Sequence, residues 1–321
     1  MRVCVLGAGS LGSVIGAMLA RSGHDVTLVT RNDAHVSAIR RRGLLLVDDR
    51  ERREVAVGAA TSVDGLTPPD LLVVLVKSFD TRSAMEEAAD LVGDDTLVLT
   101  LQNGVGCDEI IAEIVGADRV IAGRTFVGGR LTEPGVVEYG VEGRMTVLGE
   151  LDGRVTDRLR VVADAFEASG MAVEISADIV AMAWEKLFVN VATGAWSALT
   201  GLPYGELSVH PEIERMAIAT VQEAIDVARA LGVGVTTSDP QVPWRRAWEG
   251  LPYGFKASML QSVEKGSQTE VDVMHGAVTA GGRRAGVPTP VNDALVAAVH
   301  GLELRLRLER ESRSDSPATL S

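Results

Sequence analysis

The chain has 321 residues, enough for about two domains; 46% of them are hydrophobic and only 4% aromatic, so Val, Leu, Ala and Ile build its core. Its 31 Lys and Arg residues stand against 44 Asp and Glu, a net charge of −13, which argues against a nucleic-acid partner because phosphate binding needs clustered positive charge. Residues 1–22 are neither long enough nor apolar enough for a membrane span.

The first element is an apolar strand at 2–6, which runs directly into a glycine motif and then into a helical pattern. In the pattern G-x-G-x-x-G, the first glycine allows a tight turn, the second admits a pyrophosphate to the backbone, and the third lets the helix pack on the strand. The pyrophosphate then binds the N–H groups at the helix N-terminus. The predicted cofactor-binding residues here are Gly7, Ala8, Gly9, Ser10, Leu11 and Gly12.

Strand and helix signals alternate as far as residue 176, as in a doubly wound α/β domain. Apolar runs such as 71–76 lack polar alternation, which indicates parallel strands buried on both faces. The predicted strands are 2–6, 25–30, 71–76, 96–101 and 119–127, with further strands, expected to be antiparallel, at 135–150 and 172–176. The predicted helices are 11–22, 33–42, 80–91, 107–115 and 155–169.

The second half of the chain reads as helices separated by Gly and Pro breaks. The predicted helices are 178–199, 211–231, 255–266, 268–285 and 289–309. We therefore expect a dinucleotide-binding domain at 1–176, a helical substrate and dimerisation domain at 177–309, and a polar, disordered tail at 310–321.

The end of the second strand bears on cofactor choice. NAD-binding domains place an acid there to hold the ribose hydroxyls, whereas this strand ends in Thr30-Arg31-Asn32. Arg31 is placed to bind a 2′-phosphate, which favours NADPH over NADH, although a solvated surface arginine would look the same. Asp33 is expected to cap the next helix.

Two polar residues follow neighbouring strands. Lys77 follows the strand 71–76 and Asn103 follows 96–101, and the carboxyl ends of parallel strands are where ligands bind in such sheets. Asn103 begins an Asn-Gly pair, so a simple turn is the alternative. Together, the two residues favour a ligand-binding site at the carboxyl edge of the predicted sheet.

The helical half carries further candidates. Lys186 and Asn190 lie four residues apart and share one helix face in an apolar segment. A lysine in such a segment normally has a charged or hydrogen-bonding partner or a functional role. Ser258 offers a hydroxyl and Glu270 a carboxylate. For Glu270 the alternative is a first-turn acid of a helix capped by Ser267 or Thr269.

Cysteine and histidine usage is sparse. Two distant cysteines, Cys4 and Cys107, fit a reduced cytosol. The five histidines show no metal-ligand spacing, so no metal site is expected.

These residues together resemble the ketopantoate reductase (2-dehydropantoate 2-reductase) family over Met1 to about Glu309. The matching elements are Gly7-x-Gly9-x-x-Gly12, Val76-Lys77, Gln102-Asn103-Gly104-Val105-Gly106, Trp184-x-Lys186-Leu187-x-x-Asn190, Ser258-Met259-x-Gln261 and Thr269-Glu270-x-Asp272. The resemblance implies a Rossmann-type domain followed by an all-helical domain like that of 6-phosphogluconate dehydrogenase. It also implies a cytoplasmic enzyme of pantothenate biosynthesis that forms a homodimer.

The resemblance also implies roles. Lys186 would be the general acid that protonates the ketone oxygen as hydride from NADPH reaches the carbonyl carbon. Asn190 and Ser258 would bind the 2-oxo acid, and Asn103 would hold the substrate or the nicotinamide. Glu270 would orient Lys186 or contact the cofactor ribose, and Lys77 would line the cofactor cleft.

Three positions depart from the family pattern. Gly194 and Phe255 stand where members often carry Asn, and Ser262 stands where Asp is usual. The first two changes remove hydrogen-bonding groups from the substrate side and make one wall apolar. One alternative is therefore the same scaffold reducing a bulkier or more apolar 2-oxo acid, and a second is a non-catalytic NADPH-binding sensor.

Overall fold

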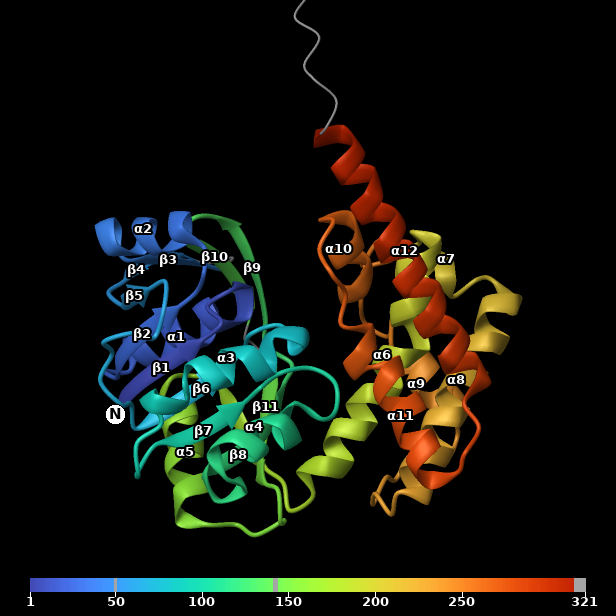
Figure 1. Ribbon diagram of the computed structural model, residues 1–321, viewed down its shortest axis with the longest axis horizontal. Helices are drawn as coiled ribbons and strands as arrows, with labels where there is room; N and C mark the ends of the chain where they lie inside the picture. Colours follow the sequence, from blue (N-terminus) through green and yellow to red (C-terminus); the bar gives the residue numbers. More distant parts are fainter. Residues whose placement is uncertain (49–50, 141–143, 315–321) are drawn as a thin grey trace, which may run out of the picture. The chain divides into compact units, whose positions relative to one another are not determined.

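The computed structural model describes residues 1–48, 51–140 and 144–314, and the chain divides into two compact units, Met1–Met182 and Ala183–Ser321. The first unit is α/β and the second is helical (Figure 1). Among the described residues no helix combines the length and apolar character needed to cross a membrane.

The main sheet of the first unit has the strand order β12-β11-β8-β7-β6-β1-β2-β5. Its strands are β1 Arg2–Leu6, β2 Asp25–Val29, β5 Gly58–Ala60, β6 Leu71–Val74, β7 Leu97–Thr100, β8 Val120–Thr125, β11 Met145–Glu150 and β12 Ala172–Ile175. The first six are parallel, whereas β11 pairs antiparallel with β8 and β12 pairs parallel with β11, so the last two run against the others. The doubly wound sheet is confirmed. Its chain order reverses between β1 and β6, the switch point at which such sheets bind ligands.

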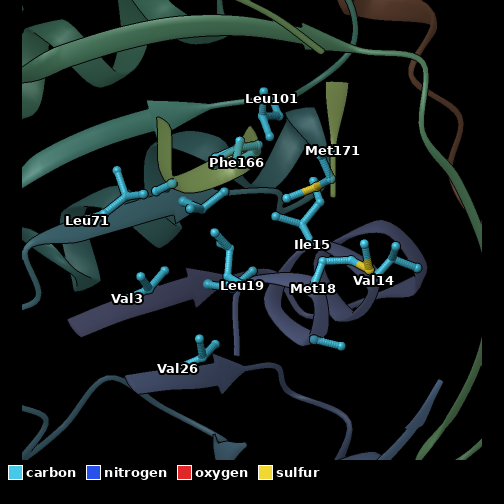
Figure 2. Packing of buried hydrophobic residues seen from close by; sticks show 14 of the residues in the cluster. Val3, Val14, Ile15, Met18, Leu19, Val26, Leu71, Leu101, Phe166 and Met171 are labelled. Carbon is cyan, nitrogen blue, oxygen red and sulfur yellow. The ribbon is translucent and has the colours of Figure 1, made fainter. Parts of the chain in front are cut away.

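Helices cover both faces of this sheet. Alternate residues of β1 face opposite sides, Val3 and Val5 in one cluster and Cys4 and Leu6 in the other. Helices α1 (Ser10–Arg21) and α5 (Asp157–Ala168) cover the first face, and α3 (Thr81–Glu87) and α4 (Cys107–Val115) cover the second. Figure 2 shows Leu19 of α1 on the side of Val3 of the sheet and Ile15 beside Met171. Burial on both faces explains the unbroken apolar runs of the sequence.

A second, four-stranded sheet was not predicted. It has the order β4-β3-β10-β9, formed by β3 Leu44–Val47, β4 Arg52–Val55, β9 Gly128–Glu133 and β10 Val136–Gly140. Helix α2 (Asp33–Arg42) precedes β3, and α1 packs against this sheet as well as the main one. The strands expected at 135–150 are β10 and β11, which belong to different sheets; residues 141–143 lie outside the described residues. The expected antiparallel pairing holds for β10 with β9 and for β11 with β8, whereas β12 pairs parallel with β11.

The helices of the second half are α6 Ile179–Thr200, α7 Tyr204–Leu207, α8 Pro211–Ala230, α9 Gln241–Arg246, α10 Ser258–Glu264, α11 His275–Ala285 and α12 Pro290–Ser314. The short helices α7 and α9 were not predicted. The tail expected at 310–321 is wrong for 310–314, which continue α12, and residues 315–321 lie outside the described residues.

Helix α11 begins at His275 rather than at residue 268. The Thr269 N–H donates to Glu303 Oε1 of α12 at 2.7 Å, and the Val271 N–H donates to Thr269 Oγ1 at 3.3 Å. These bonds favour a turn and a short 3₁₀ helix, Val271–Val273. The interpretation of Ser267 or Thr269 as the cap of a helix at 268 is therefore wrong.

A buried polar network joins α8, α11 and α12. Glu223 of α8 accepts the N–H groups of Val291 and Asn292, both at 2.9 Å, in the first turn of α12. The Asn292 amide donates to Glu223 Oε2 at 2.7 Å, so its oxygen faces His275 Nδ1 at 2.9 Å and fixes the tautomer with the proton on that nitrogen. His275 is fully buried, and burial lowers its pKa from 6.5 to about 4 despite the Asn292 bond.

We expect this histidine to make stability fall in acid. Because the unfolded state, with a pKa of 6.5, binds the proton more tightly than the folded state, with a pKa of about 4, stability is present above pH 6.5 and falls as the pH drops through that window. The shift corresponds to about 3 kcal/mol. Urea unfolding at pH 7 and pH 4 should show that His275→Gln loses about this much less stability between the two values than the wild type.

The matched control is His300→Gln, because His300 is exposed and pairs with Asp272 at 3.1 Å. It should keep the acid sensitivity of the wild type. An equal loss of stability in wild type and His275→Gln would contradict the role assigned to burial.

Candidate active site

The glycine turn between β1 and α1 has the geometry that its sequence predicts. Gly7 has a φ of 101°, and a Cβ on it would lie 2.3 Å from the Val76 nitrogen. A Cβ on Gly12 would lie 2.4 Å from the Gly7 oxygen, whereas a Cβ on Gly9 would meet nothing within 4 Å. Gly7 and Gly12 thus allow backbone contact, and Gly9 leaves the approach to the helix N-terminus open.

The first turn of α1 supplies the hydrogen-bond donors. The N–H groups of Gly7 and Ala8 donate to the Val29 oxygen, at 3.0 and 2.9 Å, and that of Gly9 to the Gly7 oxygen at 2.8 Å. The N–H groups of Ser10, Leu11 and Gly12 point out of the helix start, where no carbonyl one turn earlier can accept them. No acid lies in this turn, so the positive end of the helix dipole is not offset locally.

Buried hydrogen bonds fix this turn to its neighbours. His35 Nδ1 accepts the Gly135 N–H at 2.9 Å, so its Nε2 carries the proton and donates to Ser13 Oγ at 3.1 Å. Ser13 Oγ donates in turn to the Ala8 oxygen at 3.4 Å. His35 and Ser13 are fully buried, and burial lowers the His35 pKa, which keeps the ring neutral. The sequence interpretation missed His35, which lies in an ordinary helical pattern.

The segment that carries Lys77 lies against the glycine turn. Lys77 is exposed and follows Val76, whose nitrogen approaches Gly7. Gln102, 4% exposed, fixes this segment: its Nε2 donates to the Val76 oxygen at 2.9 Å and to Thr81 Oγ1 at 2.8 Å. The neighbouring Asn103 is half-buried in the loop between β7 and α4. Lys77 and Asn103 thus follow adjacent parallel strands, and Gln102 links the two strand ends.

Arg31 follows β2, with 81% of its side chain exposed, and pairs with Asp80 Oδ2 at 2.6 Å. This pairing was not predicted. The residue that caps α2 is Asn32, whose Oδ1 accepts the His35 N–H at 3.1 Å. The expected capping role of Asp33 is therefore wrong, because Asp33 is the first residue inside the helix.

In the helical unit, Lys186, Asn190 and Gly194 follow one another at intervals of four along α6, on one stripe of the helix. Lys186 and Asn190 are half-buried. A Cβ on Gly194 would lie 3.6 Å from Met259 Cε of α10, with no other contact within 4 Å. The stripe therefore reaches the helix that Ser258 begins, and Ser258 is exposed there.

The neighbour of Lys186 serves a structural purpose. Glu185 Oε1 accepts the N–H groups of Thr236 and Thr237, at 2.7 and 2.8 Å, and the carboxylate also accepts both threonine hydroxyls. Burial alone raises the pKa of Glu185, but these donors outweigh it and the pKa lies below its usual value. Glu185 thus fixes the loop after α8 to α6.

The remaining predicted residues lie on connections. Glu270 is half-buried and directly precedes the 3₁₀ helix Val271–Val273. Phe255 is 41% exposed, its oxygen accepts the Tyr204 N–H at 2.9 Å, and the two rings lie 5.7 Å apart. Ser262 is buried on α10. Gly194 therefore lies next to Met259 in the first turn of α10, and the rings of Tyr204 and Phe255 lie together near the segment that precedes this helix.

A cavity of about 460 Å³ opens on the small sheet, and its lining residue Gly129 lies close to the start of α1, because a Cβ there would be 3.1 Å from the Ser10 oxygen. Its lining includes Asp48, Arg130, Glu138 and Tyr139, and none of the predicted site residues. Arg130 and Glu138 pair at 2.8 Å, and Tyr139 donates to Asp48 at 2.9 Å, so its polar groups satisfy one another. We assign no chemistry to this cavity.

Comparison with protein families gives two matches. The model for ketopantoate reductase PanE/ApbA matches residues 3–153, and the model for its C-terminal region matches residues 178–303. Among curated proteins, the 2-dehydropantoate 2-reductase of Halobacterium salinarum is 38% identical over 91% of this chain and 95% of its own. That of Pyrococcus horikoshii is 33% identical over 94% of this chain and 98% of its own.

Solved structures agree. A PanE/ApbA family ketopantoate reductase from Ralstonia eutropha superposes with a TM-score of 0.87 at 32% identity, over 96% of this chain and all of the other. D-mandelate dehydrogenase with NADH and anilino(oxo)acetate superposes with the same TM-score at 25% identity, over the same shares. The chain belongs to the ketopantoate reductase family and is a pyridine-nucleotide-dependent oxidoreductase.

Proposed function

We propose that the protein reduces 2-dehydropantoate to pantoate with NADPH, in the biosynthesis of pantothenate. The main support is the position of Lys186 and Asn190 on one stripe of α6 in the helical unit. The α/β unit contributes the glycine turn, in which a Cβ on Gly9 would meet no atom within 4 Å. The names of its relatives support the same substrate. The glycine turn, from Gly7 to Gly12, would receive the pyrophosphate.

Bound NADPH supplies the hydride to the carbonyl carbon of the substrate. Lys186 then protonates the carbonyl oxygen, because an ammonium stabilises the developing alkoxide and can give up a proton to it. Asn190, one turn further along α6, hydrogen-bonds the substrate together with Ser258. Asn103 holds the substrate or the nicotinamide from the edge of the sheet, Glu270 orients Lys186 or contacts the ribose, and Lys77 lines the cofactor site.

The end of β2 supports NADPH as the cofactor. No acid occupies the position at which NAD-binding domains hold the ribose, and Arg31 stands there instead. Its pair with Asp80 is exposed, and exposed pairs contribute at most about 1 kcal/mol, so a doubly charged phosphate can replace that partner. The similar structure of D-mandelate dehydrogenase contains NADH. A preference of this protein for NADH over NADPH would therefore contradict the proposal.

A different 2-oxo acid is the second candidate. Gly194 leaves room beside Met259, and Tyr204 and Phe255 add an aromatic surface before α10. These features favour a more apolar substrate than 2-dehydropantoate. Turnover of NADPH with 2-dehydropantoate, beside branched and aromatic 2-oxo acids, decides between the two: the acid with the highest kcat/KM is the substrate class.

The family resemblance further suggests a homodimer in the cytoplasm. Light scattering on the purified chain measures its mass directly. A mass near 34 kDa rather than twice that value would contradict the dimer, since the chain weighs 33.9 kDa.

We expect Lys186→Ala to lower kcat by about 10³-fold, within the range usual for loss of a general acid. NADPH affinity, measured by fluorescence titration, should stay within about threefold because the glycine turn is untouched. Lys265→Ala is the matched control: Lys265 is exposed at the end of α10 and should leave kcat unchanged. Undiminished turnover in Lys186→Ala would remove the lysine from the mechanism.

We expect Arg31→Ala to raise KM for NADPH by about 10- to 100-fold, the loss of hydrogen bonds to a charged group. KM for NADH should change little, because NADH lacks the 2′-phosphate. Asp80→Asn removes the present partner of Arg31 and should not raise KM for NADPH. An equal rise for both cofactors in Arg31→Ala would place the arginine outside 2′-phosphate recognition.

A further inference from the structure

Arg124 is a buried cation whose side chain makes few hydrogen bonds within the described residues. It lies in β8, 4% exposed, and its Nη1 donates to the Gly123 oxygen at 2.7 Å. Its Nε is buried without a hydrogen-bond partner in the part of the chain that the structure describes. A buried guanidinium with unused donors is costly, so such a group calls for an anion or an ordered water.

Two carboxylates of this unit are also buried, Asp108 at 8% and Glu150 at 3% exposed. Glu150 accepts Arg158 Nε at 2.8 Å and Nη2 at 2.5 Å, and it accepts Thr156 as well. For Arg124 the carboxylate whose charge acts on it is Asp108, in the first turn of α4, but the two form no ion pair among the residues described. Arg124 therefore keeps hydrogen-bonding capacity that Glu150 does not.

Register places Arg124 at the functional edge of the sheet. Thr100 of β7 pairs with Ala122 of β8, so two residues further on Arg124 lies beside Gln102, next to Asn103. Its side chain shares the face of Val120, which packs with Ile111 of α4. The guanidinium is therefore at the carboxyl edge of the strands, near the start of α4.

The loop between Asn103 and α4, which follows the same edge of the sheet, contains two glycines in the left-handed region. Gly104 and Gly106 have φ values of 84° and 101°, which favour glycine, and a Cβ on Gly106 would meet nothing within 4 Å. Gly106 is the N-cap residue of α4, so no side chain caps this helix.

We infer that Arg124 binds the carboxylate of the 2-oxo acid and is a specificity-determining residue for the reaction. This inference rests on the proposed function. Every 2-oxo acid carries a carboxylate beside its ketone, and the planar fork of arginine matches two carboxylate oxygens. In a chain of net charge −13 that anion needs a local cation.

The test compares a 2-oxo acid with its methyl ester, which keeps the ketone and loses the charge. In Arg124→Met we expect KM for the acid to rise about 100-fold, the loss of a charge-assisted hydrogen-bond pair. The KM for NADPH should stay within about threefold. The preference for the acid over the ester should fall by about the same 100-fold, which a merely structural loss would not produce. Arg119→Met is the matched control, because Arg119 precedes the other end of β8 and should leave both KM values unchanged.

The outcomes separate the two proposals. Wild-type enzyme that reduces no 2-oxo acid would overturn the proposed function and this inference with it. Active wild type with an unchanged acid-to-ester preference in Arg124→Met would overturn the inference alone. If Arg124→Met fails to fold, Arg124→Lys, which keeps the charge and loses the fork, should raise KM for the acid about tenfold, and an unchanged KM would contradict the inference.

Discussion

The approach of two backbones at Gly7 is the constraint on which the first unit depends. A side chain at this position would overlap the Val76 nitrogen, and one at Gly12 would overlap the Gly7 oxygen. These contacts bring the start of α1, the end of β1 and the segment of Lys77 together. A dinucleotide turn and a polar strand end thus become neighbours because two glycines carry no side chain.

Uncharged buried hydrogen bonds, rather than ion pairs, support this arrangement. His35 and Ser13 link the turn to the β9–β10 connection, and Gln102 links the ends of β6 and β7. Buried polar groups that are fully paired make a site rigid without the desolvation penalty of buried charges.

Sequence patterns predicted the elements whose signal is local. Parallel strands buried on both faces, the glycine turn and the four-residue spacing of Lys186 and Asn190 all follow from periodicity. The small sheet was missed because its strands carry little signal: β4 has four residues, and most residues of β4 and β9 are exposed. Arg124 is a single charge within an apolar strand, and its significance lies in its missing partners, which only three-dimensional packing shows.

The Ser10 hydroxyl connects the first turn of α1 to strand β9. It accepts the Leu131 N–H of β9 at 3.0 Å, and it stands in the first turn of α1. A hydroxyl that accepts from a strand still has its own proton to donate to an anion, and each bond polarises the other. Under the proposed function, a nucleotide at the turn would strengthen the Leu131 bond, so the solvent exchange rate of the Leu131 amide would report on nucleotide binding.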